Sequence, residues 1–195
     1  MHTEPTRDRI LEAARSLFDA EGEAGLSMRR IAGAVGITPM AIYRHYADKE
    51  ALKDALMLDG FAAWEARVEA IAAPGPVAWL TGLGEAYLDF ALAQPRRYEA
   101  AFLLKADAAR RFPRDIEAGR SPVLRKAIAR IGQAQAEGVL VPAPPVQVAL
   151  HLAALMQGLV SMYRAGRFTD EAEFRAAYRR ALDHCLNSFR TETRS

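Results

Sequence analysis

The chain is poor in the features that mark secreted and membrane proteins. It has one cysteine, Cys185, so no disulfide can form within it, which fits a reducing compartment. Its longest apolar stretch, residues 146–163, contains polar residues such as His151 and Gln157, and falls short of the uninterrupted run of a spanning helix. The first residues show no apolar segment of a secretory signal. These absences predict a cytoplasmic protein.

Patterns of catalytic and metal sites are also missing. The four histidines have no paired spacing with carboxylates, and there is no G-x-S-x-G sequence and no glycine-rich phosphate loop. Cys185 lies on an apolar helical stripe, where a small core residue is the simpler interpretation than a redox sensor. We therefore expect no enzyme activity, no metal and no cofactor. The net charge of +2 does not by itself indicate a nucleic-acid-binding protein.

Strand patterns are absent as well, and alanine is abundant, so the sequence predicts an all-α fold of about nine helices. We expect an N-terminal three-helix DNA-binding domain over residues 1–52 and a C-terminal helical domain over residues 53–195. Two short helices fall within residues 27–46. The other expected helices are residues 6–21, 48–71, 77–94, 96–105, 122–137, 146–165 and 170–190, with a loop containing helical pieces at 106–119.

The most informative segment has the pattern of a helix-turn-helix. Ser27 is the expected N-cap of a short helix that ends at Gly36, because glycine reaches a positive φ without a steric clash. Thr38 then caps a second helix, with Pro39 in the first turn, where a missing N–H costs nothing. Two short helices joined by a three- or four-residue turn are the geometry of this motif.

The helical period predicts which residues of the second helix face outward. If Ile42 points to the core, Met40 and Arg44 lie opposite, flanked by Ala41 and Tyr43, a mixture suited to base edges, thymine methyls and phosphates. The alternative is an ordinary helical hairpin with a solvated face, since residues 1–60 hold eight Lys/Arg against ten Asp/Glu. The cations expected to meet phosphates are Arg29, Arg30, Lys49 and Lys53.

Residues 7–53 resemble the N-terminal domain of the TetR/AcrR family of transcription factors. The matching blocks are residues 9–14, 17–18, 27–32, 35–37, 41–46 and 48–52. The resemblance implies a dimeric regulator in which Tyr43, His45 and Lys49 mainly meet phosphates. Spacing and resemblance together give one candidate DNA-contact set: Ser27, Arg29, Thr38, Pro39, Met40, Ala41, Tyr43, Arg44, His45 and Lys49.

The expected helix at 146–165 is apolar on almost every side and must be covered on almost every side. The family resemblance implies that it forms a four-helix bundle with the last helix and their symmetry mates. The alternative is that the helices of one chain simply cover each other. The candidate dimer residues are Leu152, Leu155, Leu159, Met162, Tyr178, Leu182, Cys185 and Phe189.

Large side chains with a few polar neighbours point to a small-molecule site between helices. Residues 82–104 resemble the WHG subtype of C-terminal domain, although Gln157-Gly158 stands where that subtype has His-Gly. Core packing is the alternative for each aromatic residue taken alone. The candidate ligand-binding residues are Trp79, Tyr87, Phe90, Tyr98, Phe102, Phe112, His151, Met156, Gln157 and Tyr163.

The sequence thus predicts a homodimeric repressor that binds a palindromic DNA operator and is released by a small, largely apolar effector of unknown identity. Two alternatives stay open. One is a helical ligand-binding enzyme with a vestigial DNA-binding domain, and the other is a non-specific DNA-binding protein.

Overall fold

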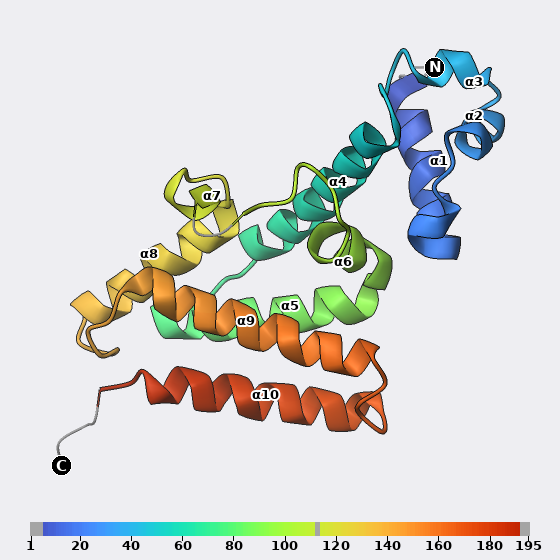
Figure 1. The fold of residues 1–195 in the computed structure, drawn as a ribbon. Coiled ribbons are helices and arrows are strands. Elements are labelled where there is room, and N and C mark those ends of the chain that lie inside the picture. Colours follow the sequence, from blue (N-terminus) through green and yellow to red (C-terminus); the bar gives the residue numbers. More distant parts are fainter. Residues whose placement is uncertain (1–5, 112–113, 192–195) are drawn as a thin grey trace. The chain divides into compact units, whose positions relative to one another are not determined.

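The computed structural model describes residues 6–111 and 114–191, and within these ranges every regular element is helical (Figure 1). The all-α prediction is confirmed. An isolated bridge joins Leu140 and Arg190, and no strand occurs in the described ranges. The elements are α1 (Thr6–Glu21), the 3₁₀ helix η1 (Gly22–Gly25), α2 (Met28–Val35), α3 (Pro39–Ile42), α4 (Lys49–Glu69), α5 (Pro76–Ala93), α6 (Pro95–Phe102), α7 (Arg114–Glu117), α8 (Pro122–Ala136), α9 (Pro145–Arg164) and α10 (Glu171–Ser188).

The count of ten α-helices in the described ranges exceeds the predicted nine by one short element. This is the four-residue α7, which lies in the segment expected to be a loop with helical pieces. The longer helices begin and end within a few residues of their expected limits. Caps explain this agreement: the carboxylate of Asp48 accepts from the backbone N–H of Ala51 at 2.8 Å, and that of Asp170 accepts from Glu173 at 2.8 Å.

Packing divides the chain into two compact units. The first unit comprises the residues up to Trp64 together with Gln94–Ala109, and the second comprises Glu65–Ala93 and the residues from Arg110 onward. Most of α4 and the whole of α6 therefore pack with the N-terminal helices. The predicted boundary after residue 52, as a division of function, stays a prediction.

The core of the first unit is built from one face of each N-terminal helix. Ile10 and Phe18 of α1, Ile31 of α2 and Ile42 of α3 are all almost completely buried. Each such side chain contributes about 1.5–3 kcal/mol. Because α2 and α3 are short, their stability comes from this shared core rather than from helix propensity.

Helix α6 is bound to the rest of the first unit by its two arginines. Arg96 donates to the backbone carbonyl of Asp19 at 3.1 Å, and Arg97 lies 3.8 Å from the carboxylate of Asp59 on α4. The same carboxylate pairs with Arg15 of α1 at 2.8 Å. A Cβ at Gly60 would lie 2.8 Å from a backbone oxygen of α6, so glycine is what allows this close approach.

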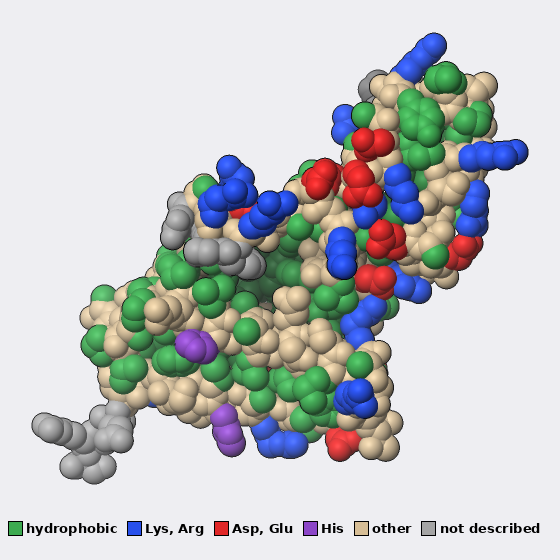
Figure 2. All heavy atoms as spheres, in the orientation of Figure 1, with side chains coloured by type: hydrophobic (Ala, Val, Ile, Leu, Met, Phe, Trp, Pro, Cys, Tyr) green, Lys and Arg blue, Asp and Glu red, His purple; other side chains and the backbone are tan. Residues whose placement is uncertain are grey.

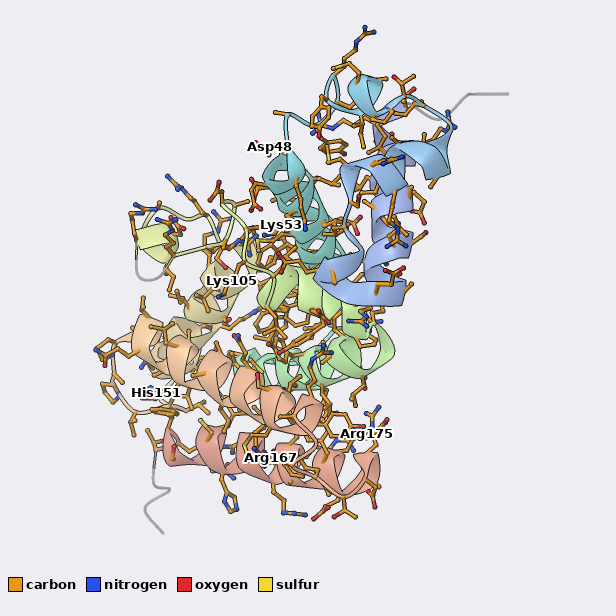
Figure 3. The ribbon with its side chains drawn as sticks, turned by 45° about the vertical axis from the view of Figure 1, so that its right-hand side comes forward. Asp48, Lys53, Lys105, His151, Arg167 and Arg175 are labelled. Atoms are coloured by element: carbon orange, nitrogen blue, oxygen red, sulfur yellow. The ribbon has the colours of Figure 1, made fainter. Side chains whose placement is uncertain are left out.

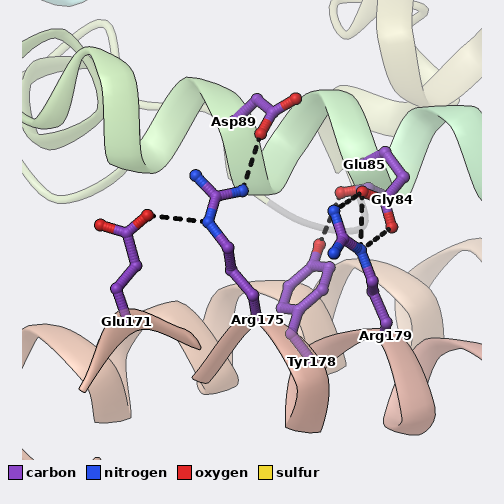
Figure 4. Close-up of polar contacts among 7 residues, drawn as sticks. All are labelled: Gly84, Glu85, Asp89, Glu171, Arg175, Tyr178 and Arg179. Atoms are coloured by element: carbon purple, nitrogen blue, oxygen red, sulfur yellow. Dashed lines mark hydrogen bonds and ion pairs between the residues drawn. The ribbon is translucent and has the colours of Figure 1, made fainter. Parts of the chain in front are cut away.

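In the second unit, α5 is the central helix. It packs against α8, α9 and α10, and buries Trp79, Tyr87 and Phe90. Helix α10 presents Tyr178 to the backbone of α5, with Arg175 and Arg179 paired to α5 carboxylates on its edge (Figure 4). These contacts place the last helix of the chain against α5.

Helix α9 is only partly covered by its own chain. By length and composition alone it is apolar enough to span a membrane, a test that the core helices of soluble proteins also pass. Only 28% of that window is buried inside the described structure. The expectation that α9 is buried on almost every side therefore does not hold within one chain.

Candidate DNA-binding surface

The helix-turn-helix is formed by the local interactions that its sequence predicts. Gly36 has φ +76° and ends α2, where its N–H donates to the carbonyls of the preceding turn. The hydroxyl of Thr38 accepts from the backbone N–H of Ala41 at 3.2 Å, with Pro39 at the first position of α3. Ser27 occupies the N-cap position of α2, but its hydroxyl makes no capping bond.

The rotation of α3 is the predicted one. Ile42 is fully buried and Tyr46 is 3% exposed, whereas Met40 is 75% and Tyr43 is 48% exposed. Arg44 also lies at the surface. Figure 2 shows hydrophobic and basic side chains side by side over the part of the first unit that carries α2 and α3. A thioether, a phenol and a guanidinium are thus available to a ligand on this face.

All ten candidate DNA-contact residues lie in the first unit, and none is buried. Arg29, Thr38, Pro39, Met40, Tyr43 and Arg44 are exposed, and Ser27, Ala41, His45 and Lys49 are half-buried. DNA contact by these individual residues stays a prediction.

The prediction that Lys53 supplies phosphate charge is wrong. The side chain of Lys53, which is labelled in Figure 3, is buried. Its Nζ lies 2.9 Å from a carboxylate oxygen of Glu23 and 3.1 Å from one of Glu50. Burial opposes the charge of Lys53, but hydrogen bonds and attraction from these two carboxylates raise its pKa. The ammonium group of Lys53 therefore forms ion pairs within the protein and is not available to a phosphate.

Arg30 is likewise engaged, because its guanidinium makes two hydrogen bonds to the carboxylate of Glu21, at 2.7 and 2.5 Å. In contrast, Arg29, Arg44 and Lys49 make no ion pair within the described part of the chain. The positive charge that this surface offers to a ligand therefore comes from three of the five cations singled out in the sequence.

The candidate ligand-binding residues belong to both units. Trp79, Tyr87, Phe90 and Met156 are buried in the second unit, and Tyr98 and Phe102 belong to α6 in the first. His151 is exposed beside Phe189, Gln157 is half-buried, and Tyr163 stacks on Phe174 with the ring centroids 4.3 Å apart. Phe112 lies outside the described residues. A ligand-binding role for these residues stays a prediction.

Two aromatic residues that the sequence analysis did not single out join this set. Phe61 and Trp64 of α4 make edge contacts with Phe102, with centroids 5.7 and 6.1 Å apart, and Tyr98 lies 5.3 Å from the same ring. Phe61 and Trp64 are separated by three positions, the spacing that puts two residues on one face of a helix. This spacing in the sequence could have identified Phe61 and Trp64 as neighbours on one face of α4.

The candidate dimer residues divide into two groups. Leu152, Tyr178 and Leu182 are buried in the core of their own chain. The other residues keep surface exposure: Met162 is 49% exposed, and Leu155, Leu159, Cys185 and Phe189 are half-buried. A dimer contact by any of the eight candidate residues stays a prediction.

Both parts of the chain match models of known protein families. A family model described as bacterial regulatory proteins, tetR family, matches residues 10–56, and one described as tetracyclin repressor-like, C-terminal domain, matches residues 80–185. The second model spans more than half of the chain and includes residues 82–104, the segment compared above with the WHG subtype.

Among curated relatives, the chain is 43% identical over 79 residues to the HTH-type transcriptional repressor DrrR1 of Streptomyces coeruleorubidus. This match covers 34% of the chain and 29% of DrrR1, so the chain spans less than a third of the length of that relative.

Solved structures extend the likeness over the whole fold. A protein of unknown function from Rhodococcus sp. RHA1 matches with a TM-score of 0.77 and 28% identity, covering 97% of each chain. AibR, solved in complex with isovaleryl coenzyme A and operator DNA, matches with a TM-score of 0.60 and 22% identity, covering 94% of this chain and 97% of AibR. The capped helix-turn-helix, the helical C-terminal unit and both family models lead to one conclusion: the chain belongs to the TetR family of DNA-binding transcription regulators.

Proposed function

We propose that this regulator is a repressor that binds a palindromic operator as a homodimer and is released by a small, largely apolar effector. The observation that carries the DNA-binding part is the exposure of Met40, Tyr43 and Arg44 beside the buried Ile42. In this proposal Arg44 reads a base edge, while Tyr43 and Lys49 contact phosphates.

The proposal of a dimer rests on the face of α9 that its own chain leaves uncovered. This face carries the half-buried Leu155 and Leu159 and the exposed Met162. Exposed apolar side chains grouped on one helix are typical of a protein interface. Two-fold symmetry then presents two recognition helices to half-sites about 34–36 Å apart or at a related spacing.

The proposed release is a coupling free energy between the effector site and the operator. Helix α4 begins at Lys49, three residues after Tyr46, and the same helix continues into the second unit. A change in the position of α4 on effector binding would alter the separation between the recognition helices, α3, of the two protomers. The name of DrrR1 describes a repressor, and AibR was solved with both an acyl-coenzyme A and operator DNA, which supports this class of mechanism.

The experiment that tests the proposal is selection of bound fragments from a genomic DNA library by the full chain, followed by titration in excess competitor DNA. A single palindromic sequence that keeps its complex in competitor supports a specific regulator. Binding that competitor abolishes for every fragment would identify a non-specific DNA-binding protein instead. The matched variant is Arg44→Ala. It should bind the operator more weakly and lose discrimination between bases at one position in each half-site.

A further inference from the structure

The recognition helix α3 contains only four residues, so its orientation depends on what holds its two ends. Ile42 anchors one side of α3 in the core of the first unit. A single anchor leaves so short a helix free to tilt about it. The chain immediately before and immediately after α3 must therefore be held by other parts of the unit.

The turn that precedes α3 is open on its outer side. A Cβ built on Gly36 would meet nothing within 4 Å, so packing at this position does not fix the turn. The N–H of Ile37 donates to the carbonyl of Ala32 at 3.0 Å, and that of Gly36 donates to the preceding turn of α2. These bonds satisfy part of the set of carbonyls that a helix leaves without partners at its C-terminus. Val35, the last residue of α2, carries another of these carbonyls.

The guanidinium of Arg9 binds the carbonyl of Val35. Nη2 of Arg9, on α1, donates to this backbone oxygen at 2.8 Å, across 26 positions of the sequence. The donor is charged and lies at the negative end of the α2 dipole, so this bond is stronger than one between neutral groups. Arg9 makes no ion pair within the described part of the chain. Its bond to Val35 therefore faces no competition from a carboxylate.

The other end of α3 is held by the same part of α1. Tyr46, four residues after the last residue of α3, is buried, and its hydroxyl donates to the backbone carbonyl of Arg7 at 3.4 Å. The guanidinium of Arg7 lies over the Tyr46 ring, 5.1 Å from its centroid. The beginning of α1 thus contacts the chain just before α3 and just after it. Figure 1 shows α1, α2 and α3 together in the first unit.

Contacts to base edges depend on this placement more than contacts to phosphates do. A side chain that reads a base must be held within about 0.5 Å of its productive position. Phosphate contacts fix register and orientation but carry no sequence information. Loss of the bond between Arg9 and Val35 would release the turn and allow α3 to tilt about Ile42. Discrimination between DNA sequences would then fall before general affinity for DNA does.

We infer that Arg9 is a positioning residue for DNA recognition: its guanidinium, bound to the Val35 carbonyl, fixes the turn of the helix-turn-helix and, through the turn, the recognition helix. Arg9 acts here through Val35 and not by touching DNA. The inference rests on the DNA-binding function of the family, and its part that concerns an operator rests on the proposed function.

The first experiment compares Arg9→Met with Lys105→Met in binding to the selected operator and to competitor DNA, at several salt concentrations. Methionine keeps an apolar stem but removes the charge and the donors. Lys105 is an exposed cation of the same unit (Figure 3), so its variant is the control for the lost charge. Relative to this control, Arg9→Met should bind the operator about tenfold more weakly, with the same affinity for competitor DNA and the same salt slope. Arg9→Lys restores a charged donor and should recover part of the operator affinity.

Hydrogen exchange of the free chain tests the fixing of the turn without DNA. In Arg9→Met the backbone N–H groups of Ile37 and Ala41 should exchange about tenfold faster, because the turn opens more often. Those of α10 should be unchanged, and Lys105→Met should alter neither set. Unchanged exchange at Ile37 and Ala41 would overturn the inference, whatever the DNA titration gives.

Two results of the DNA titration would also overturn it. An equal loss of affinity for operator and competitor DNA, with the salt slope reduced by about one per chain, would make Arg9 a direct phosphate contact. Operator affinity equal to that of Lys105→Met would mean that the bond to Val35 does not serve recognition. A native chain that prefers no sequence would contradict the proposed function, whereas the exchange measurement would still decide whether Arg9 fixes the turn.

Discussion

The hydroxyl of Tyr178 on α10 donates to the backbone carbonyl of Gly84 on α5 at 2.9 Å (Figure 4). One turn further along α10, Leu182 fills the space beside the same glycine, and a Cβ on Gly84 would lie 2.2 Å from its Cδ2. The hydrogen bond and the packing contact both depend on the absence of a side chain at position 84. The two helices approach each other this closely because α5 has a glycine there.

Gly84→Ala should therefore destabilise the protein, although alanine is the better helix former. Overpacking costs about 1–3 kcal/mol, which outweighs the gain of up to about 1 kcal/mol in helix propensity. Gly132→Ala in α8 is the control, because nothing lies within 4 Å of a Cβ there, and it should stabilise the chain. Urea unfolding of both variants checks the opposite signs, and a stabilised Gly84→Ala would contradict the packing described above.

Lys49 and Lys53 differ by one helical turn and should behave as different kinds of residue. Lys49→Ala should weaken binding to every DNA sequence and reduce the slope of affinity against salt by about one per chain. Lys53→Ala should leave the slope unchanged and lower the free energy of unfolding, because it leaves Glu23 and Glu50 without their shared cation. Equilibrium binding at several salt concentrations, together with thermal unfolding, separates the two outcomes.

Arg44→Ala should cost about 1–3 kcal/mol of operator affinity and relax discrimination at one base position in each half-site. The side chain is exposed and unpaired within the described part of the chain, so its removal should leave the fold intact. Competition with a set of single-base operator variants measures the change. Unchanged operator affinity would remove Arg44 from the base-reading residues.

Met162→Glu should dissociate the proposed dimer without unfolding the chain, because the side chain of Met162 is half exposed in the single chain. A carboxylate buried at an apolar interface without a partner costs several kcal/mol. Val139→Glu introduces the same charge at another exposed apolar residue and should stay dimeric. Sedimentation should give twice 21.4 kDa for the native chain and 21.4 kDa for Met162→Glu. A native monomer at micromolar concentration would contradict the proposed assembly.

Asp115 should make stability depend on acid pH. The backbone hydrogen bond from Arg111, with attraction from Arg120 and Arg114, holds its pKa below the usual value despite burial. A lowered folded pKa contributes stability above the unfolded value of about 4, and this contribution is lost as the pH falls through the folded pKa. The difference in unfolding free energy between the native chain and Asp115→Asn should therefore shrink below about pH 4. A difference in unfolding free energy that does not depend on pH would mean that the charge of Asp115 is not what stabilises the fold.

Helix limits were predictable from sequence because short-range chemistry determines them. Thr38 and Asp48 bond within three residues, and Gly36 has the positive φ expected at a helix end. The state of Lys53 was not predictable, because one of its partners is Glu23, thirty residues earlier, brought near only by packing. Helical periodicity puts Tyr178 and Leu182 on one face of α10, but it cannot tell whether a core or a partner covers that face. Tyr178 and Leu182 are covered by α5 of the same chain.

The internal ion pairs of the first unit affect how the regulator competes for its operator in a whole genome. Arg30 and Lys53 are neutralised by Glu21 and by Glu23 and Glu50, so few cations remain for the uniform charge of the double helix. Non-specific affinity for DNA determines how much of the protein is bound at sites other than the operator. This affinity rises steeply with the number of phosphates that the protein neutralises. With a small number of free cations, this background occupancy is low. A small number of base contacts is then enough for a few protein molecules to occupy the operator in the presence of the many competing non-specific sites of a genome.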